Sequence, residues 1–164
     1  MLLPTRASGR AGRSAGAIPQ DEREGMPYSV TTEADVLRKY RTIAVVGASS
    51  DPEKPAHYVP AFLQQHGYRI IPVNPNEADV LGEKSYPDLA SVPDAVEVVE
   101  IFRRSEDVPP VVEEAIRIGA KAVWMQEGIV HEAAARRAAE AGLEVVMDRC
   151  MKTELRELME SGGA

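Results

Sequence analysis

The chain is poor in several residue types, and each shortage excludes a class of protein. It has one cysteine, Cys150, in 164 residues, so it can form no internal disulfide and no cysteine-rich metal cluster, which fits a reducing cytoplasm. No apolar run is longer than a strand, which excludes a membrane-spanning helix. Basic residues number 19 against 26 acidic ones, and the net charge of −7 argues against a general nucleic-acid or membrane-surface binder. We therefore expect a cytoplasmic protein whose anion site, if it has one, is a local basic pocket.

The first residues lack a hydrophobic pattern. Residues 1–25 are rich in Arg, Gly, Ala and Ser, and the acidic cluster at 21–24 interrupts the amphipathic helix that a transit peptide would need. We predict a disordered extension over residues 1–27, with Met26 as an alternative start. A single folded domain is then expected over residues 28–160, which is enough chain to bury a core of its own.

The rest of the sequence alternates between strand and helix patterns. Apolar runs predict strands over 42–46, 69–73, 96–102, 122–125 and 143–147. Helical spacing is found over 32–40, in a segment that ends at Gly67, and over 105–118 (with Ser105 as its cap), 130–141 and 151–159. This alternation predicts an α/β fold, a doubly wound, Rossmann-like parallel sheet of about five strands in a single domain.

The end of the first predicted strand is the most informative segment. One glycine is followed by small residues, and a helical pattern opens near Ala56. Such a junction leaves backbone N–H groups at a helix N-terminus, where phosphate binds readily, and serine hydroxyls can add hydrogen bonds. We therefore predict a phosphate-bearing ligand. The candidate contacts in this loop are Gly47, Ala48, Ser49, Ser50, Pro52 and Lys54.

The sequence departs from the pattern of nicotinamide enzymes at two points. Those enzymes carry three glycines in the first loop and an acidic residue at the end of the second strand. Here the loop has Gly47 alone, and the second strand ends in Val73-Asn74-Pro75, with no acid before Glu77. An NAD(P)-binding redox enzyme or sensor stays open as an alternative, as does an interaction module without a ligand.

Four segments together resemble the small stand-alone CoA-binding proteins: residues 46–50, 71–75, 124–128 and 147–150. The fold of those proteins resembles the nucleotide-binding domain of the succinyl-CoA synthetase alpha subunit. The resemblance runs from about residue 41 to 156 and implies that coenzyme A or an acyl-CoA binds at the carboxyl ends of the strands. It implies a non-catalytic binder, carrier or sensor, because the active histidine of the synthetase belongs to a second domain without a counterpart here.

The resemblance also implies a place for each candidate residue. The loop from Gly47 to Lys54 would hold the diphosphate, with Ser49 and Ser50 as donors and Lys54 as a countercharge. The other implied contacts are Val73, Asn74 and Pro75 beside the adenine and ribose, Phe102 and Arg103 on the adjoining wall, and Trp124, Gln126 and Glu127 along the pantetheine arm.

Some of these residues have a structural interpretation as well. Trp124 ends a strand and fits core packing as well as ligand contact. Cys150 begins a helix, where it is either an inert thiol or one that forms a mixed disulfide with CoA. His57, His66 and His131 are widely spaced and predict neither a catalytic triad nor a metal site, so we do not expect an enzyme. Nothing in the sequence separates a monomer from a homodimer or identifies a protein partner.

Overall fold

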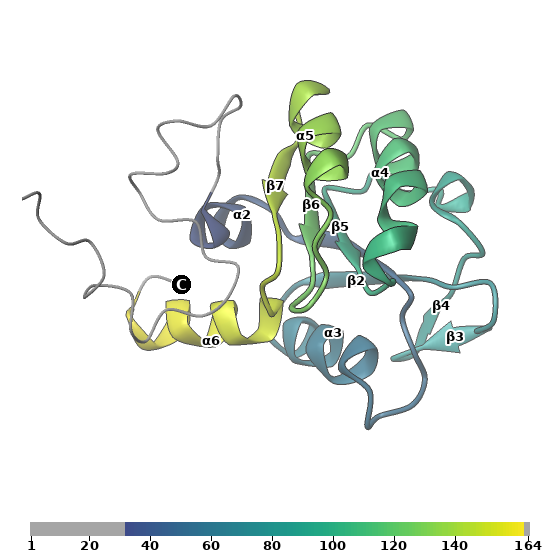
Figure 1. Cartoon of the computed structure of the whole chain (residues 1–164). Coiled ribbons are helices and arrows are strands. Elements are labelled where there is room, and N and C mark those ends of the chain that lie inside the picture. Colours follow the sequence, from purple (N-terminus) through teal and green to yellow (C-terminus); the bar gives the residue numbers. More distant parts are fainter. Residues whose placement is uncertain (1–31, 163–164) are drawn as a thin grey trace, which may run out of the picture.

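The structure, a computed structural model, describes residues 32–162 (Figure 1). Within this range, a five-stranded parallel sheet with the strand order β2-β1-β5-β6-β7 confirms the predicted α/β, Rossmann-like fold. The extension predicted over residues 1–27 lies outside the described residues. The strands are β1 (Thr42–Val46), β2 (Arg69–Val73), β5 (Val98–Ile101), β6 (Ala122–Met125) and β7 (Glu144–Val146).

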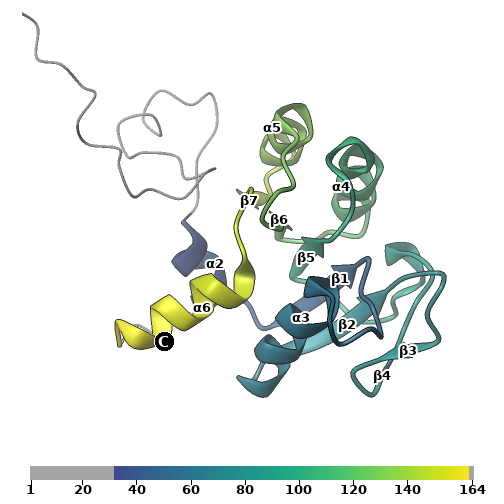
Figure 2. The ribbon, with the colours of Figure 1, turned by 60° about the horizontal axis from the view of Figure 1, so that its bottom comes forward.

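Helices cover both faces of the sheet, which explains why the strands are continuously apolar. One face packs against α2, α3 and α6 around Val45, Trp124 and Leu155, and the other packs against α4 and α5 around Val99 and Val112. Figure 2 shows the two groups of helices on opposite sides of the sheet. The helices are α2 (Glu33–Lys39), α3 (Pro55–Gln65), α4 (Val108–Arg117), α5 (Glu132–Glu140) and α6 (Met151–Glu160). None of the helices within residues 32–162 is long and apolar enough to cross a membrane.

The helix predicted to start at Ser105 begins three residues later. Ser105–Asp107 form a short 3₁₀ turn, η3, and the Ser105 hydroxyl accepts a hydrogen bond from the Val130 N–H at 3.0 Å instead of capping the helix. The first turn of α4 contains Pro109 and Pro110, which have no N–H to donate to a cap. The serine is therefore available to fasten the segment after β6 to the segment after β5.

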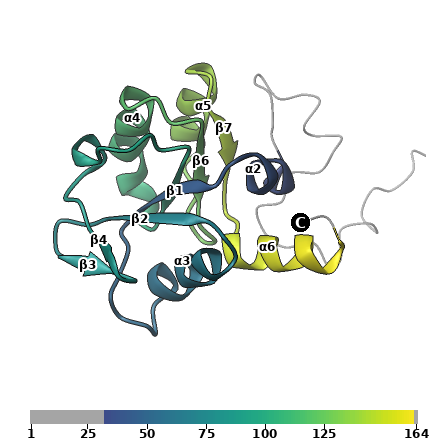
Figure 3. The same cartoon turned by 180° about the vertical axis from the view of Figure 1, so that it is seen from behind.

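A hairpin between β2 and β5 was not predicted. It pairs β3 (Asp79–Val80) with β4 (Glu83–Lys84), and Figure 3 places it on the far side of α3 from α6. Its two-residue strands are too short to show a periodic pattern, and its turn uses Leu81 and Gly82, both with positive φ (57° and 76°). The segment then returns through the short 3₁₀ helix η2 (Leu89–Ser91) to β5.

Candidate functional site

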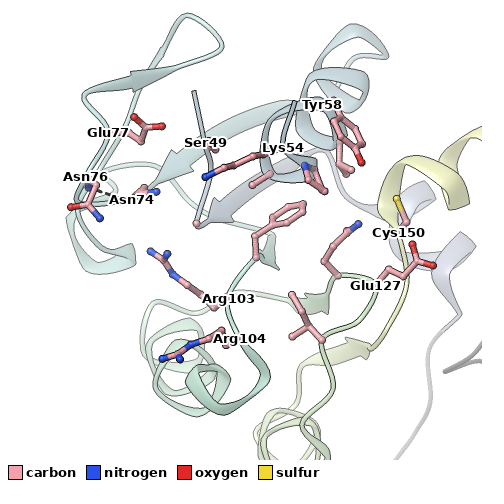
Figure 4. Close-up of a pocket in the computed structure, with 17 residues that line it drawn as sticks. Ser49, Lys54, Tyr58, Asn74, Asn76, Glu77, Arg103, Arg104, Glu127 and Cys150 are labelled. Atoms are coloured by element: carbon pink, nitrogen blue, oxygen red, sulfur yellow. Dashed lines mark hydrogen bonds between the residues drawn. The ribbon is translucent and has the colours of Figure 1, made fainter. Parts of the chain in front are cut away.

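A cavity of about 760 Å³ lies at the carboxyl ends of the strands (Figure 4). It lies beside β1 and β5, the neighbouring strands between which the strand order reverses. Ligands of doubly wound sheets bind at this place, and the volume is typical of small-molecule sites. Predicted residues that line it are Gly47, Ser49, Lys54, Asn74, Phe102, Arg103, Gln126 and Glu127. Further lining residues are Pro55, Ala56, Tyr58, Val59, Asn76, Glu77, Arg104, Ile129 and Cys150.

Gly47 lines the cavity at a point where the backbone leaves no room for a side chain. Its φ of 92° lies in the left-handed region, and its N–H donates to the Val73 carbonyl at 2.9 Å. A Cβ at this position would lie 2.2 Å from the Phe102 carbonyl oxygen. The loop after β1 therefore passes directly beside the end of β5, and only glycine meets both conditions.

The backbone of the first loop differs from the prediction. The Ser49 N–H donates to the Ala56 carbonyl (3.2 Å), the Asp51 N–H to the Ser49 hydroxyl oxygen (3.0 Å), and the Ser50 N–H to Glu77 (2.5 Å). The backbone N–H groups that were expected to be free for a phosphate are therefore largely hydrogen-bonded within the protein. The α3 N-terminus adds few donors, because its first residue is Pro55.

The Ser49 side chain keeps one donor for a ligand. Its oxygen accepts from Asp51, but its hydroxyl proton has no acceptor among the described residues. The Ser49 carbonyl lies 2.8 Å from His57 Nδ1, a contact that holds the loop against α3. Ser49 thus faces the cavity in a fixed position, in agreement with its predicted place at the strand–helix junction.

Two cations of the cavity have no ion pair within residues 32–162. Lys54 and Arg103 line the cavity, and none of the salt bridges formed among these residues involves them. The neighbouring Arg104 instead pairs with Glu106 at 2.9 Å and with Asp107 at 3.0 Å. Lys54 and Arg103 therefore place positive charge on the cavity wall that no salt bridge among residues 32–162 neutralises.

The turn after β2 is tied to the loop after β1. Asn74 donates through Nδ2 to the Ala48 carbonyl at 2.8 Å, and its Oδ1 accepts from the Asn76 N–H. The Glu77 carboxylate also reaches the loop and accepts two hydrogen bonds from Ser50, which lower the pKa of Glu77. In the sequence Glu77 stands out only as the first acid after β2, and no local pattern indicates that it lies in the site.

Trp124 belongs to the core, which corrects its implied place along the cavity. The side chain is 0% exposed, and its Nε1–H donates to the Arg149 carbonyl at 2.8 Å. Both faces of β6 are covered by helices, so a large residue at its end packs inward. This bond and the Met151 N–H, which donates to Gln126 Oε1 at 3.4 Å, hold the start of α6 over β6. Cys150 is thereby brought to the cavity wall.

Five further candidates lie next to the lining residues without being among them. Ala48 and Val73 are buried in the core, while Ser50, Pro52 and Pro75 are exposed on the loops outside. Ala48 and Val73 act on the site through their backbone, because their carbonyls hold Asn74 and Gly47. Contact of these five residues with a ligand stays a prediction.

Glu100 is an acidic residue inside the core and was not among the predicted site residues. It lies on β5 between Val45 and Trp124, is 0% exposed, and neither of its oxygens has a hydrogen-bond partner among the described residues. Burial, with a smaller contribution from the Cys150 thiol, raises the pKa of Glu100 well above its ordinary value of 4.5. Burial therefore favours the neutral, protonated form of this carboxyl.

These features define a class: a doubly wound, Rossmann-like protein with a cavity, lined in part by Lys54 and Arg103, at the carboxyl ends of its parallel strands. The chain belongs to the CoA binding domain family, whose sequence profile matches residues 41–156. The family supports a CoA-related role.

Three similar proteins illustrate the range of this family. YneT of Bacillus subtilis, an uncharacterized protein, is 40% identical over 118 residues, which are 72% of this chain and 87% of YneT. A hypothetical protein from Pyrococcus horikoshii has a solved structure with a TM-score of 0.75 and 42% identity, covering 79% of this chain and 93% of that one. The ADP-forming acetate–CoA ligase II of Archaeoglobus fulgidus is 33% identical over 114 residues, which are 68% of this chain but 17% of the ligase.

Proposed function

We propose that this chain binds coenzyme A or an acyl-CoA in the cavity at the strand ends and acts as a non-catalytic binder, carrier or sensor. The observation that carries the proposal is the position of Lys54 and Arg103, two cations on the cavity wall with no ion pair among the described residues of an acidic protein. A phosphate-rich ligand would supply the missing negative charge. The chain's membership of the CoA binding domain family supports the choice of ligand.

The chemistry of the two ends of the cavity suggests how CoA would lie. Asn74, Asn76 and Glu77 form the end nearest β2, while Tyr58 and Cys150 lie toward α6 (Figure 4). In Figure 4 the charged ends of Lys54 and Arg103 lie nearer to the Asn74 end than to Cys150, so the diphosphate would sit toward that end. The adenosine part would then extend toward Asn74 and the pantetheine thiol, with any acyl group, toward Cys150.

A dinucleotide remains the second candidate because of one feature. Glu77 stands beyond the end of β2 on the cavity wall, near the place where nicotinamide enzymes hold the ribose hydroxyls with an acid. Both of its carboxylate oxygens, however, already accept hydrogen bonds from Ser50. The test must therefore include NAD and NADP.

A thermal-shift panel of CoA, acetyl-CoA, NAD, NADP and ATP on the full chain tests the proposal. A ligand at a hundred times its Kd stabilises the protein by about 2.7 kcal/mol, which shifts the Tm of a domain of this size by several degrees. Ser49→Asp, which adds a negative charge on the wall, should abolish the CoA shift, whereas Ser161→Asp at the end of α6 should leave it unchanged. A shift with NAD alone, or with none of the five, would contradict the proposal.

A further inference from the structure

An acidic side chain of the cavity wall, Glu77, occupies donors of Ser50, a loop residue next to the cavity, that would also suit a ligand anion. The Ser50 N–H donates to Glu77 Oε2 at 2.5 Å, and the Ser50 hydroxyl donates to Oε1 at 3.0 Å. Both oxygens of one carboxylate are therefore held by one residue of the loop after β1. A phosphate oxygen would accept the same two hydrogen bonds.

Glu77 is held in this position by its own turn and by charge. Its N–H donates to the Asn74 carbonyl at 3.3 Å, and Asn74 in turn binds Ala48 in the loop that contains Ser50. The hydrogen bonds from Ser50, and next the positive charge of Lys54, lower the pKa of Glu77, while burial opposes them. The side chain is thus a carboxylate anion at neutral pH, directed at the same loop and the same lysine as the proposed diphosphate.

We propose that Glu77 is a resident anion that favours highly charged ligands over monoanions. Its carboxylate accepts the Ser50 hydrogen bonds and is attracted by the charge of Lys54 until a more highly charged group displaces it. This inference rests on the proposed function, because it concerns the same cavity. A single carboxylate or other monoanion has no more charge than Glu77 and gains little by replacing it. A diphosphate carries more charge and interacts with Lys54 and Arg103 together, so it displaces the carboxylate from Ser50.

The inference predicts that Glu77 lowers affinity for every anion while it favours diphosphates over monoanions. Glu77→Gln keeps the size of the side chain and an acceptor for Ser50, but removes the charge. We expect this variant to bind inorganic pyrophosphate and CoA roughly tenfold more tightly than the wild type, as expected when one like charge is removed close to an anion. Chloride, a monoanion, should also compete with these ligands more strongly in the variant than in the wild type.

Isothermal titration calorimetry of the full chain with pyrophosphate and with CoA tests this. The matched control is Glu53→Gln, which removes the same charge from the same loop, where Glu53 is exposed and does not line the cavity. Tighter binding to Glu77→Gln but not to Glu53→Gln is the expected result. Equal gains in the two variants would show an effect of net charge alone, and weaker binding to Glu77→Gln would show that Glu77 organises the loop; either would overturn the inference.

The pyrophosphate titration separates this inference from the proposed function. If pyrophosphate binds Glu77→Gln more tightly than the wild type and CoA binds neither protein, the proposed role of Glu77 is supported and the CoA proposal fails. If CoA binds the wild type and Glu77→Gln with equal affinity, and pyrophosphate also binds both proteins with equal affinity, the CoA proposal is supported. The proposed role of Glu77 is then wrong.

Discussion

Gly47 and Phe102 approach each other so closely that no side chain fits between them. They come from the ends of the neighbouring strands β1 and β5, where the Phe102 N–H also donates to the Val46 carbonyl at 2.8 Å. A Cβ on Gly47 would lie 2.2 Å from the Phe102 carbonyl oxygen, a distance that real Cβ atoms do not adopt. This approach fixes the position of the first loop relative to Arg103, the next residue along the cavity wall.

The first prediction is that Gly47→Ala strongly destabilises the fold. The alanine must move the backbone of either β1 or β5 and must also adopt a φ of 92°. We expect a loss of about 3 kcal/mol or more in the free energy of unfolding, measured by urea denaturation. Gly67→Ala is the control, because Gly67 has a similar φ of 91° but open space around its Cβ position; it should cost about 1 kcal/mol. Equal losses would contradict the steric argument.

The second prediction concerns pH and Glu100. Its pKa in the folded state lies above the ordinary value of 4.5 because the carboxyl is buried, so the folded protein binds more protons than the unfolded chain. The contribution of Glu100 to stability is therefore greatest below pH 4.5 and falls as the pH rises toward the folded-state pKa, by about 1.4 kcal/mol per pH unit. Glu100→Gln removes this titration.

Urea unfolding between pH 5 and pH 8 measures the Glu100 effect. The wild type should lose more stability over this range than Glu100→Gln, and the difference between the two should grow with pH. The exposed Glu83→Gln serves as the control and should follow the wild type. Parallel curves for Glu100→Gln and the wild type would show that Glu100 is ionised in the folded protein.

The third prediction compares two neighbouring arginines. Arg103→Gln should weaken CoA binding by about tenfold, because Arg103 has no ion pair among the described residues and its charge is available to a phosphate. Arg104→Gln should weaken it by about twofold, because Glu106 and Asp107 already pair with that guanidinium. Calorimetry at two salt concentrations measures both affinities. The CoA affinity of Arg103→Gln should depend less on salt than that of Arg104→Gln, because a phosphate-binding charge has been removed. The reverse order of effects would place the phosphates elsewhere.

The fourth prediction uses Cys150, which is the only thiol of the chain and is half-buried on the cavity wall. Saturating acetyl-CoA, which has no free thiol to consume the reagent, should slow the alkylation of Cys150 by iodoacetamide, because the proposed pantetheine arm ends beside it. The rate is followed by mass spectrometry, with Cys150→Ser as the blank. A rate that does not change with acetyl-CoA would contradict the proposed orientation.

Much of the sheet was predictable because its signals are local. Each parallel strand is one apolar run bounded by turn residues, and the observed strands β1, β2 and β6 have the predicted bounds. The same continuity hid the direction of single side chains: Trp124 and Met125 are both fully buried but pack into different core clusters. Since β6 has no solvent-facing side, its pattern gives no information on which residue faces the ligand.

The acidic residues of the site were less predictable because their roles depend on tertiary contacts. Glu77 meets Ser50 across 27 residues, through a turn whose path the unpredicted hairpin helps to set. Glu100 gives one local signal, a charged residue within an apolar strand, but alternation with Ile101 would equally suggest an exposed face. Only the packing of helices on both faces of the sheet shows that it is buried.

The cavity walls come from segments that are distant in the sequence: the loops after β1, β2, β5 and β6, the start of α3 and the start of α6. A ligand that touches all of them would act as a non-covalent cross-link between parts of the chain that are distant in the sequence. Amide hydrogen exchange in these loops should then slow together when the ligand binds, including at Cys150 and Met151. Ligand occupancy would thus be transmitted to the α6 helix as a change in its fraying, without any change in the average fold.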